Sequence, residues 1–170
     1  GRGSTERLQE QWTAWSKMAR EMVYRPNLYK KPSRGGLELE RTAQAMRFLA
    51  DNRCVGMDVD TLPNSWAFHG PQYYLMAQLM YDPHKDAAAV LADYFRRGFG
   101  PAAGAVEQYF RVLEKAHYRL LDAVDEYRAK NDWDVPRDDM AVKLQELNAQ
   151  TWNDMTLIAE AGRWMRQAGE

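Results

Sequence analysis

The chain has 170 residues, of which 45% are hydrophobic and 28% are charged, and its formal net charge is -1 at pH 7. This length suits one domain with a real core, and this composition excludes an intrinsically disordered chain. The near-zero charge removes the electrostatic grounds for nucleic-acid binding, and no hydrophobic run approaches the roughly 18 residues of a membrane helix. We therefore expect neither nucleic acid nor a membrane as a partner.

Cys54 is the only cysteine, so no internal disulfide can form. That fits a reducing compartment without excluding export. The chain opens with Gly-Arg-Gly-Ser, which has no initiator Met and no signal-like hydrophobic core. We therefore expect a cloning scar or a cut inside a longer polypeptide, and the sequence leaves the localisation open.

Two short strands alternate with helices in the first 60 residues. Hydrophobic residues at helical spacing predict helices over 5–22 and 37–52, and short hydrophobic runs predict strands over 22–24 and 54–59. The segment 29–36 is rich in Lys, Pro and Gly, which predicts an exposed loop. This order resembles a βα repeat of a parallel sheet.

From Trp66 onwards the chain is predicted to be entirely helical. Four helices are expected, over 69–81, over 87–97, over 102–130, and from Asp138 or Asp139 to about Gln167. Asp86 is expected to cap the second of these helices, and one of the two later aspartates is expected to cap the last.

The two longest of these helices carry hydrophobic seams. The seams are Val106, Phe110, Leu113, His117, Leu120, Val124 and Tyr127, and then Leu144, Leu147, Thr151, Met155, Ile158 and Met165. Because a short turn joins the helices, we expect an antiparallel hairpin. His117 is then a packed core residue and His84 is exposed. The three scattered histidines give no zinc signature.

Two carboxylates, Asp58 and Asp60, follow the second strand. Alternate residues of an extended segment share a face, so both can point into one pocket. Close carboxylates suit general acid–base catalysis or the recognition of hydroxyls. Alternatively, one of them simply caps the next turn. The spacing also opens a calcium loop, but Pro63 stands where that loop needs Gly, so no metal is predicted.

Polar and aromatic residues surround the two carboxylates, which are our candidate catalytic residues. The candidate substrate-binding residues are Arg25, Asn27, Trp66, His69 and Tyr73. Arg25 can clamp a carboxylate and Asn27 can bind hydroxyls, although an Asn here is also an ordinary turn residue. His69 can bind a ligand oxygen, or it can be a cap or surface group. No phosphate loop or nucleophile elbow is present, and no cofactor is expected.

Four strings of the sequence together resemble one family. They are VYRPN, RFLADNRCVGMDVD, WAFHGPQYYLMAQLMYDP and DYFRRGFGPAAGAVEQYFRVLE. They look like the C-terminal region of a group of large bacterial proteins with a domain of unknown function, similar to alpha-glucuronidase-type glycoside hydrolases. In that family a (β/α)8 barrel is followed by helices, and members are predicted to act on polysaccharides. The resemblance covers roughly positions 12 to 115.

The resemblance implies that the two strands are late barrel strands. Their C-terminal ends, where barrel active sites lie, would hold Arg25, Asn27, Asp58 and Asp60. The chain lacks most of the barrel, so a catalytic residue on an earlier strand would be absent. The resemblance also implies a periplasmic or extracellular location.

We therefore predict a mainly helical chain with two short strands: the C-terminal portion of a (β/α)8-barrel glycoside-hydrolase-like protein, followed by a helical hairpin. The last βα units would occupy 1–65 and the helical region 66–170. The expected function is processing or binding of an oligosaccharide or polysaccharide, with the remainder of the barrel supplied by a longer chain or another subunit. The alternative is a non-catalytic helical interaction or scaffold module. A packed, dry Trp66 favours the scaffold, and a polar pocket around Trp66 favours sugar.

Overall fold

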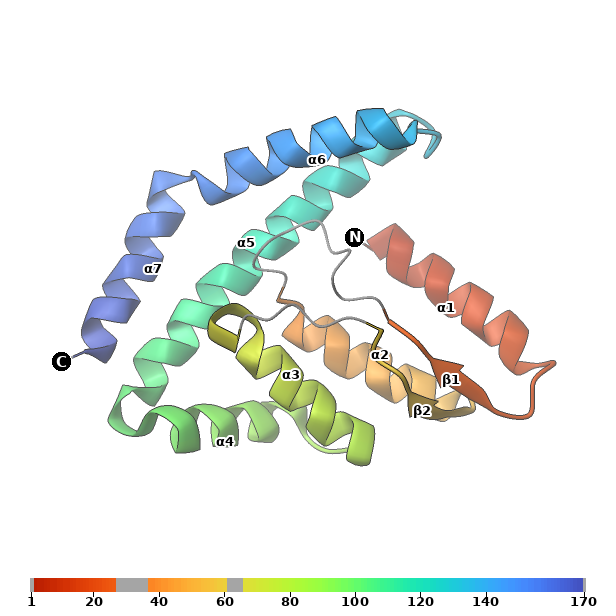
Figure 1. Ribbon diagram of the computed structural model, residues 1–170, viewed down its shortest axis with the longest axis horizontal. Helices are drawn as coiled ribbons and strands as arrows, with labels where there is room; N and C mark the ends of the chain where they lie inside the picture. Colours follow the sequence, from red (N-terminus) through yellow and green to blue (C-terminus); the bar gives the residue numbers. More distant parts are fainter. Residues whose placement is uncertain (1, 27–36, 61–65, 170) are drawn as a thin grey trace.

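The computed structural model describes residues 2–26, 37–60 and 66–169 (Figure 1). It is mainly helical, with two short parallel strands. The elements are α1 (Arg2–Ser16), β1 (Met22–Tyr24), α2 (Leu39–Asp51), β2 (Cys54–Met57), α3 (Trp66–Tyr81), α4 (Ala87–Phe99), the 3-10 turn η2 (Gly100–Ala102), α5 (Ala103–Lys130), α6 (Arg137–Trp152) and α7 (Met155–Ala168). The loop expected over 29–36 lies outside the described residues.

The two strands pair in parallel, as the βα pattern predicted, with Met22 opposite Cys54 and Tyr24 opposite Met57. Pairing continues past β2, because the Asp58 N–H donates to the Tyr24 carbonyl at 3.0 Å and the Asp60 N–H donates to the Pro26 carbonyl at 3.2 Å. The polar residues after each strand are thereby drawn to the same edge of the sheet. In Figure 1 these ends point toward the space between α1, α2 and α5.

The first helix ends at Ser16, so the prediction of a helix reaching residue 22 was wrong. The amides of Met18 and Ala19 both donate to the Trp15 carbonyl, which closes a turn and frees the next residues to enter β1. Trp12 holds α1 against the βα unit. Its indole N–H donates to the Asn52 carbonyl at 3.0 Å, and its ring lies edge-on to Tyr24.

The main core lies where α2, α3, α4 and α5 meet. Its buried members are Leu37, Leu39, Met46, Leu75, Leu79, Val90, Phe95, Val106, Phe110 and Leu113. Asp86 caps α4 as predicted, since its carboxylate accepts from the Ala88 amide at 2.9 Å. Gly100 ends α4 with a φ of 51°, a backbone conformation that suits glycine.

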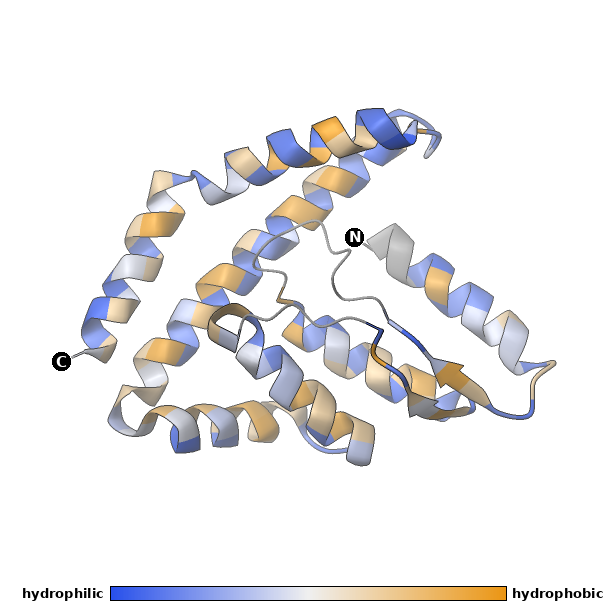
Figure 2. Cartoon of the chain, viewed as in Figure 1, coloured by the Kyte–Doolittle hydropathy of each residue, from blue (hydrophilic) through white to orange (hydrophobic). Residues whose placement is uncertain are grey.

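The predicted seam of α5 is confirmed from Val106 to Val124, since Phe110, Leu113, His117 and Leu120 are buried as well. Its last predicted member, Tyr127, is only partly buried. Figure 2 shows hydrophobic residues recurring along this helix between hydrophilic ones. In Figure 1, α6 and α7 follow α5 back in succession. The expected single return helix is therefore two shorter ones.

The break falls at Asn153 and Asp154, and the prediction of one helix from about 138 to 167 was wrong there. The Asp154 carboxylate accepts from the Thr156 amide at 2.9 Å and so starts a new helix. This restart rotates the hydrophobic face: Leu157 is buried, whereas Met155 is 74% exposed. The expected seam therefore ends with α6, and Met155, Ile158 and Met165 point to solvent.

The predicted cap of α6 was also wrong. Its N-cap residue is Pro136, which has no side-chain capping hydrogen bond. Asp138 and Asp139 lie instead inside the first turn, where acidic side chains interact favourably with the positive end of the helix dipole.

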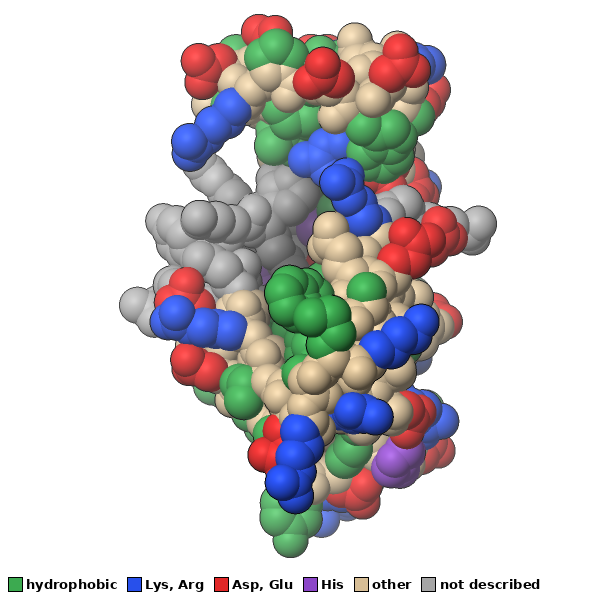
Figure 3. All heavy atoms as spheres, turned by 90° about the vertical axis from the view of Figure 1, so that its right-hand side faces the viewer, with side chains coloured by type: hydrophobic (Ala, Val, Ile, Leu, Met, Phe, Trp, Pro, Cys, Tyr) green, Lys and Arg blue, Asp and Glu red, His purple; other side chains and the backbone are tan. Residues whose placement is uncertain are grey.

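One face of the molecule is drawn in Figure 3. Acidic side chains gather at its top end, over the turn between α5 and α6, and both signs of charge mix below. Among the helices that the structure describes, none is long and hydrophobic enough to cross a bilayer.

Candidate functional site

Three charged side chains meet just beyond the ends of β1 and β2. Nε of Arg25 lies 3.0 Å from Oδ2 of Asp58, and Nη2 of Arg25 lies 2.9 Å from Oδ1 of Asp60. The side chains are 62%, 64% and 38% exposed, in the order just named. We call these three residues the Arg–Asp trio. One guanidinium thus bridges two carboxylates at the carboxyl edge of the sheet.

The backbone explains why the trio forms. Asp58 and Asp60 are alternate residues of an extended segment, so their side chains share a face. The parallel pairing brings that segment alongside the residues that follow β1. Arg25 was expected to clamp a carboxylate, and the carboxylates it contacts here belong to the same chain. The trio keeps one net negative charge when all three groups are ionised.

The start of α3 forms an aromatic cluster. The Trp66 ring meets the Tyr73 ring edge-on at 5.4 Å, and the His69 ring stacks on Tyr73 at 5.7 Å. His69 and Tyr73 are buried, at 7% and 9% exposure, whereas Trp66 is 66% exposed. Burial raises the pKa of Tyr73 above its usual value, so its phenol stays protonated. The cluster therefore presents one exposed indole on a buried support.

Gly70 allows this part of α3 to pack tightly. A Cβ placed on Gly70 would lie 2.5 Å from the Tyr94 hydroxyl oxygen, closer than such contacts occur. The glycine thus lets α4 approach the first turn of α3, which holds the aromatic cluster in place.

Asn27 lies outside the described residues, as does the segment 61–65 that joins the Arg–Asp trio to Trp66. The structure therefore places six of the seven candidate residues. It brings together Arg25, Asp58 and Asp60 in one group, and Trp66, His69 and Tyr73 in another.

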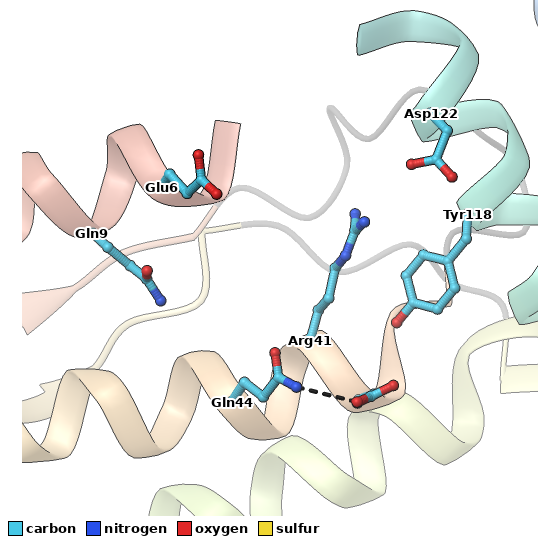
Figure 4. Close-up of a pocket in the computed structure, with 7 residues that line it drawn as sticks. Glu6, Gln9, Arg41, Gln44, Tyr118 and Asp122 are labelled. Carbon is cyan, nitrogen blue, oxygen red and sulfur yellow. Dashed lines mark hydrogen bonds between the residues drawn. The ribbon is translucent and has the colours of Figure 1, made fainter. Parts of the chain in front are cut away.

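A polar pocket of about 740 Å³ between α1, α2 and α5 was not anticipated from the sequence. It is lined by Glu6, Gln9, Glu40, Arg41, Gln44, Tyr118 and Asp122. Figure 4 shows the Arg41 side chain reaching into the space between Glu6 and Asp122. The Arg41 guanidinium also lies 4.7 Å from the centre of the Tyr118 ring, a cation–π contact. These residues are too far apart in the sequence for spacing to reveal the pocket.

A polar junction behind this pocket fixes the start of α2. The Glu114 carboxylate accepts from the Leu39 amide at 2.6 Å and from the Tyr118 hydroxyl at 3.1 Å. Glu114 on α5 thus caps α2 from a distant part of the chain. Burial raises the pKa of Tyr118 strongly, and the negative charge of Glu114 raises it further, so the phenol stays a donor. Within the described ranges, no three potential ligand side chains converge as a metal site would require.

Comparison with known proteins gives one finding on family. A family profile described as "Domain of unknown function (DUF4838)" matches residues 2–111, which run from α1 into α5 and include the Arg–Asp trio and the aromatic cluster. No curated protein and no solved structure matched the chain. Since the match covers more than half of its residues, the chain belongs to the family of this domain of unknown function.

Proposed function

We propose that the chain is the carbohydrate-binding part of a glycoside-hydrolase-like protein. The observation that carries the proposal is the Arg–Asp trio at the carboxyl edge of two parallel strands. In (β/α)8 barrels the active site lies at this edge, and the resemblance to alpha-glucuronidase-type hydrolases inferred from the sequence would make β1 and β2 late barrel strands. Under this proposal, β1 and β2 are completed by other strands of such a barrel.

The chemistry of the trio suits a sugar. Carboxylates accept hydrogen bonds from sugar hydroxyls, and the guanidinium donates to them. An exposed indole such as Trp66 can stack on the apolar face of a pyranose ring. Tyr73, which meets the indole edge-on and stacks on His69, then supports Trp66, while the trio binds hydroxyls.

Glycoside cleavage needs more than this. It requires two carboxyl groups on either side of the scissile bond, one of them protonated at the start. Asp58 and Asp60 both form ion pairs with Arg25, so we assign them to hydroxyl binding or to the support of a positive transition state. The proton donor would then come from another barrel strand.

Calorimetric titration of the full-length protein, in which other strands complete the barrel, with a panel of neutral and acidic oligosaccharides tests the proposal. Asp60→Asn and Trp66→Ala should each weaken binding about tenfold, the effect of losing one good polar or stacking contact. Trp133→Ala is the matched control, because Trp133 is also exposed but lies in the turn between α5 and α6. Binding that is unchanged by the first two variants, or absent for every sugar, would contradict the proposal.

The second candidate function is a non-catalytic scaffold. It is favoured by the exposed hydrophobic side chains of Met155, Ile158 and Met165 on α7, outside the matched family region. Absence of sugar binding, together with loss of a protein partner in Ile158→Glu, would support the scaffold.

A further inference from the structure

A second cavity lies between α2, α4 and α5, on the other side of Glu40 and Gln44 from the polar pocket. Its volume is about 390 Å³, which is within the usual range of small-molecule sites. The walls are hydrophobic: Leu39, Ala43, Ala87, Ala88, Leu91, Phe95 and Phe110. The polar groups on its lining are Glu40, Gln44, Glu107, Arg111 and Glu114. The cavity therefore combines an apolar interior with a few charged side chains.

Glu114 is the best positioned of these charged groups. Its Oε1 atom accepts from the amides of Leu39 and Glu40, at 2.6 and 3.4 Å, and from the Tyr118 hydroxyl. These bonds hold the carboxylate rigidly against the wall. Among the residues that the structure describes, its Oε2 atom receives no hydrogen bond. A fixed carboxylate thus keeps one acceptor for a ligand.

The charges around the cavity favour a cation. Three carboxylates line it against one guanidinium, and that guanidinium is already engaged: Nε of Arg111 lies 3.1 Å from Oε1 of Glu107. Among the described residues, the Glu40 carboxylate accepts from one neutral amide, that of Gln44, at 3.2 Å. The remaining negative charge is therefore carried by Glu40 and Glu114.

The aromatic wall adds a second attraction for a cation. The rings of Phe95 and Phe110 lie 5.8 Å apart, and both line the cavity. Aromatic faces attract ammonium groups, and they also pack against apolar rings. The carboxylates would repel an anionic ligand. A large polar ligand would lose hydrogen bonds to water without finding partners on the apolar wall.

We propose that this cavity is a binding site for a compact organic amine, with its apolar ring or alkyl group between α2, α4 and α5 and its ammonium group at Oε2 of Glu114. This site is separate from the Arg–Asp trio and does not depend on sugar binding there. No bond is made or broken in it, so the function of the site is recognition.

Benzylamine and benzyl alcohol are suitable probes, because they share one ring and differ in charge. Titration followed by NMR should show both perturbing the signals of cavity residues, with the amine binding about tenfold more tightly, since hydrogen bonds to charged groups are stronger than neutral ones. Phenylacetate, with the opposite charge, should bind most weakly. Equal affinity for amine and alcohol, or shifts confined to other surfaces, would overturn the proposal.

Glu114→Gln tests the carboxylate. The amide oxygen of Gln can still accept from the amides that start α2, so the cap remains while the charge is lost. The ratio of the affinities for benzylamine and benzyl alcohol should then fall to about one. Glu126→Gln is the matched control, because it makes the same change on an exposed part of α5 and should keep the preference.

Ala88→Trp tests the cavity itself. Ala88 is exposed and also lines the cavity, so a larger side chain there can block the cavity from the solvent side without entering the core. It should abolish the binding of both probes while the chain stays folded. Retained binding in this variant would overturn the proposal even if Glu114→Gln failed to fold. Oligosaccharide titration of the same variant should be unchanged, which separates this site from the proposed sugar site.

Discussion

Nε2 of His117 lies 3.3 Å from Oε1 of Glu38, and the imidazole is completely buried. His117 comes from the middle of α5, whereas Glu38 immediately precedes α2. The Glu38 amide in turn donates to Oε1 of Gln72 on α3, at 2.9 Å. The burial of His117 was predicted, but its surroundings are not purely hydrophobic. A polar contact joins three helices at the point where α2 begins.

His117→Leu should therefore destabilise the chain by about 1–3 kcal/mol, because the Glu38 carboxylate would lose its contact with the imidazole in a largely buried place. A leucine at position 117 would be tolerated only if the surroundings of the side chain were apolar. Urea denaturation measures the change. His117→Gln keeps a donor and should cost less. A neutral or stabilising effect of His117→Leu would show that the contact with Glu38 contributes nothing.

Leu113→Ala should cost about 2–5 kcal/mol, as large-to-small changes in a core do. Leu113 is 6% exposed and belongs to the main core. Ile158→Ala is the matched control: Ile158 lies on a neighbouring helix but is 47% exposed, so its loss should be below about half a kcal/mol. Thermal and urea denaturation of both variants measure the difference. Similar losses would mean that α7 is packed differently.

Asp86→Ala should destabilise the chain by about 1 kcal/mol, since its carboxylate accepts from the Ala88 and Ala89 amides at the start of α4. Asp138→Ala provides the comparison, because Asp138 lies in the first turn of α6 without capping it. Its effect should be a few tenths of a kcal/mol, from the helix dipole alone. If the two variants melted at the same temperature, the cap at Asp86 would be without energetic effect.

Asp60→Asn should change the stability of the chain by no more than about half a kcal/mol. The Arg–Asp trio is largely exposed, and ion pairs in water contribute little. Differential scanning calorimetry measures the melting temperature in low and high salt. A large loss of stability would mean that the trio holds β1 to β2, which would make its role structural and weaken the case for sugar binding.

Local pattern predicted much of this fold. The strands at Met22 and Cys54, their parallel pairing and the seam of α5 all follow from hydrophobic runs and spacing along the chain. The break before α7 also had a local signal, because Asn153 and Asp154 interrupt the helix and Asp is a favoured cap. The helical spacing of hydrophobic residues continues across the break, and this continuity favoured the prediction of a single helix.

The contacts that hold the helices together could not be predicted in the same way. Glu114 caps α2 although it is 75 positions from Leu39, and Glu38 meets His117 across 79. Nothing in the residues around Glu114 distinguishes it from an ordinary exposed glutamate of α5. Such pairings depend on how whole helices pack, and so does the cavity that Leu39 and Glu114 line.

The two-stranded sheet leads to a last prediction, about association. A barrel cylinder needs eight strands, and the described part of the chain pairs only β1 with β2. Unpaired strand edges recruit other strands, and Val55 of β2 is 61% exposed beside a groove lined by Leu49, Leu79 and Met80. We therefore expect the 170-residue chain to associate as its concentration rises in sedimentation velocity.

Val55→Lys should reduce that association, because a charge on an edge strand opposes pairing. Val142→Lys is its control: Val142 is 68% exposed, but it lies on α6, far along the chain from the sheet. Amide exchange gives an independent measure, since β1 and β2 pair only with each other among the described residues, and amides on their unpaired edges should exchange quickly in the dilute chain. A compact monomer with strongly protected amides throughout both strands would refute the partial barrel. The helices would then form an independent domain that needs no further strands.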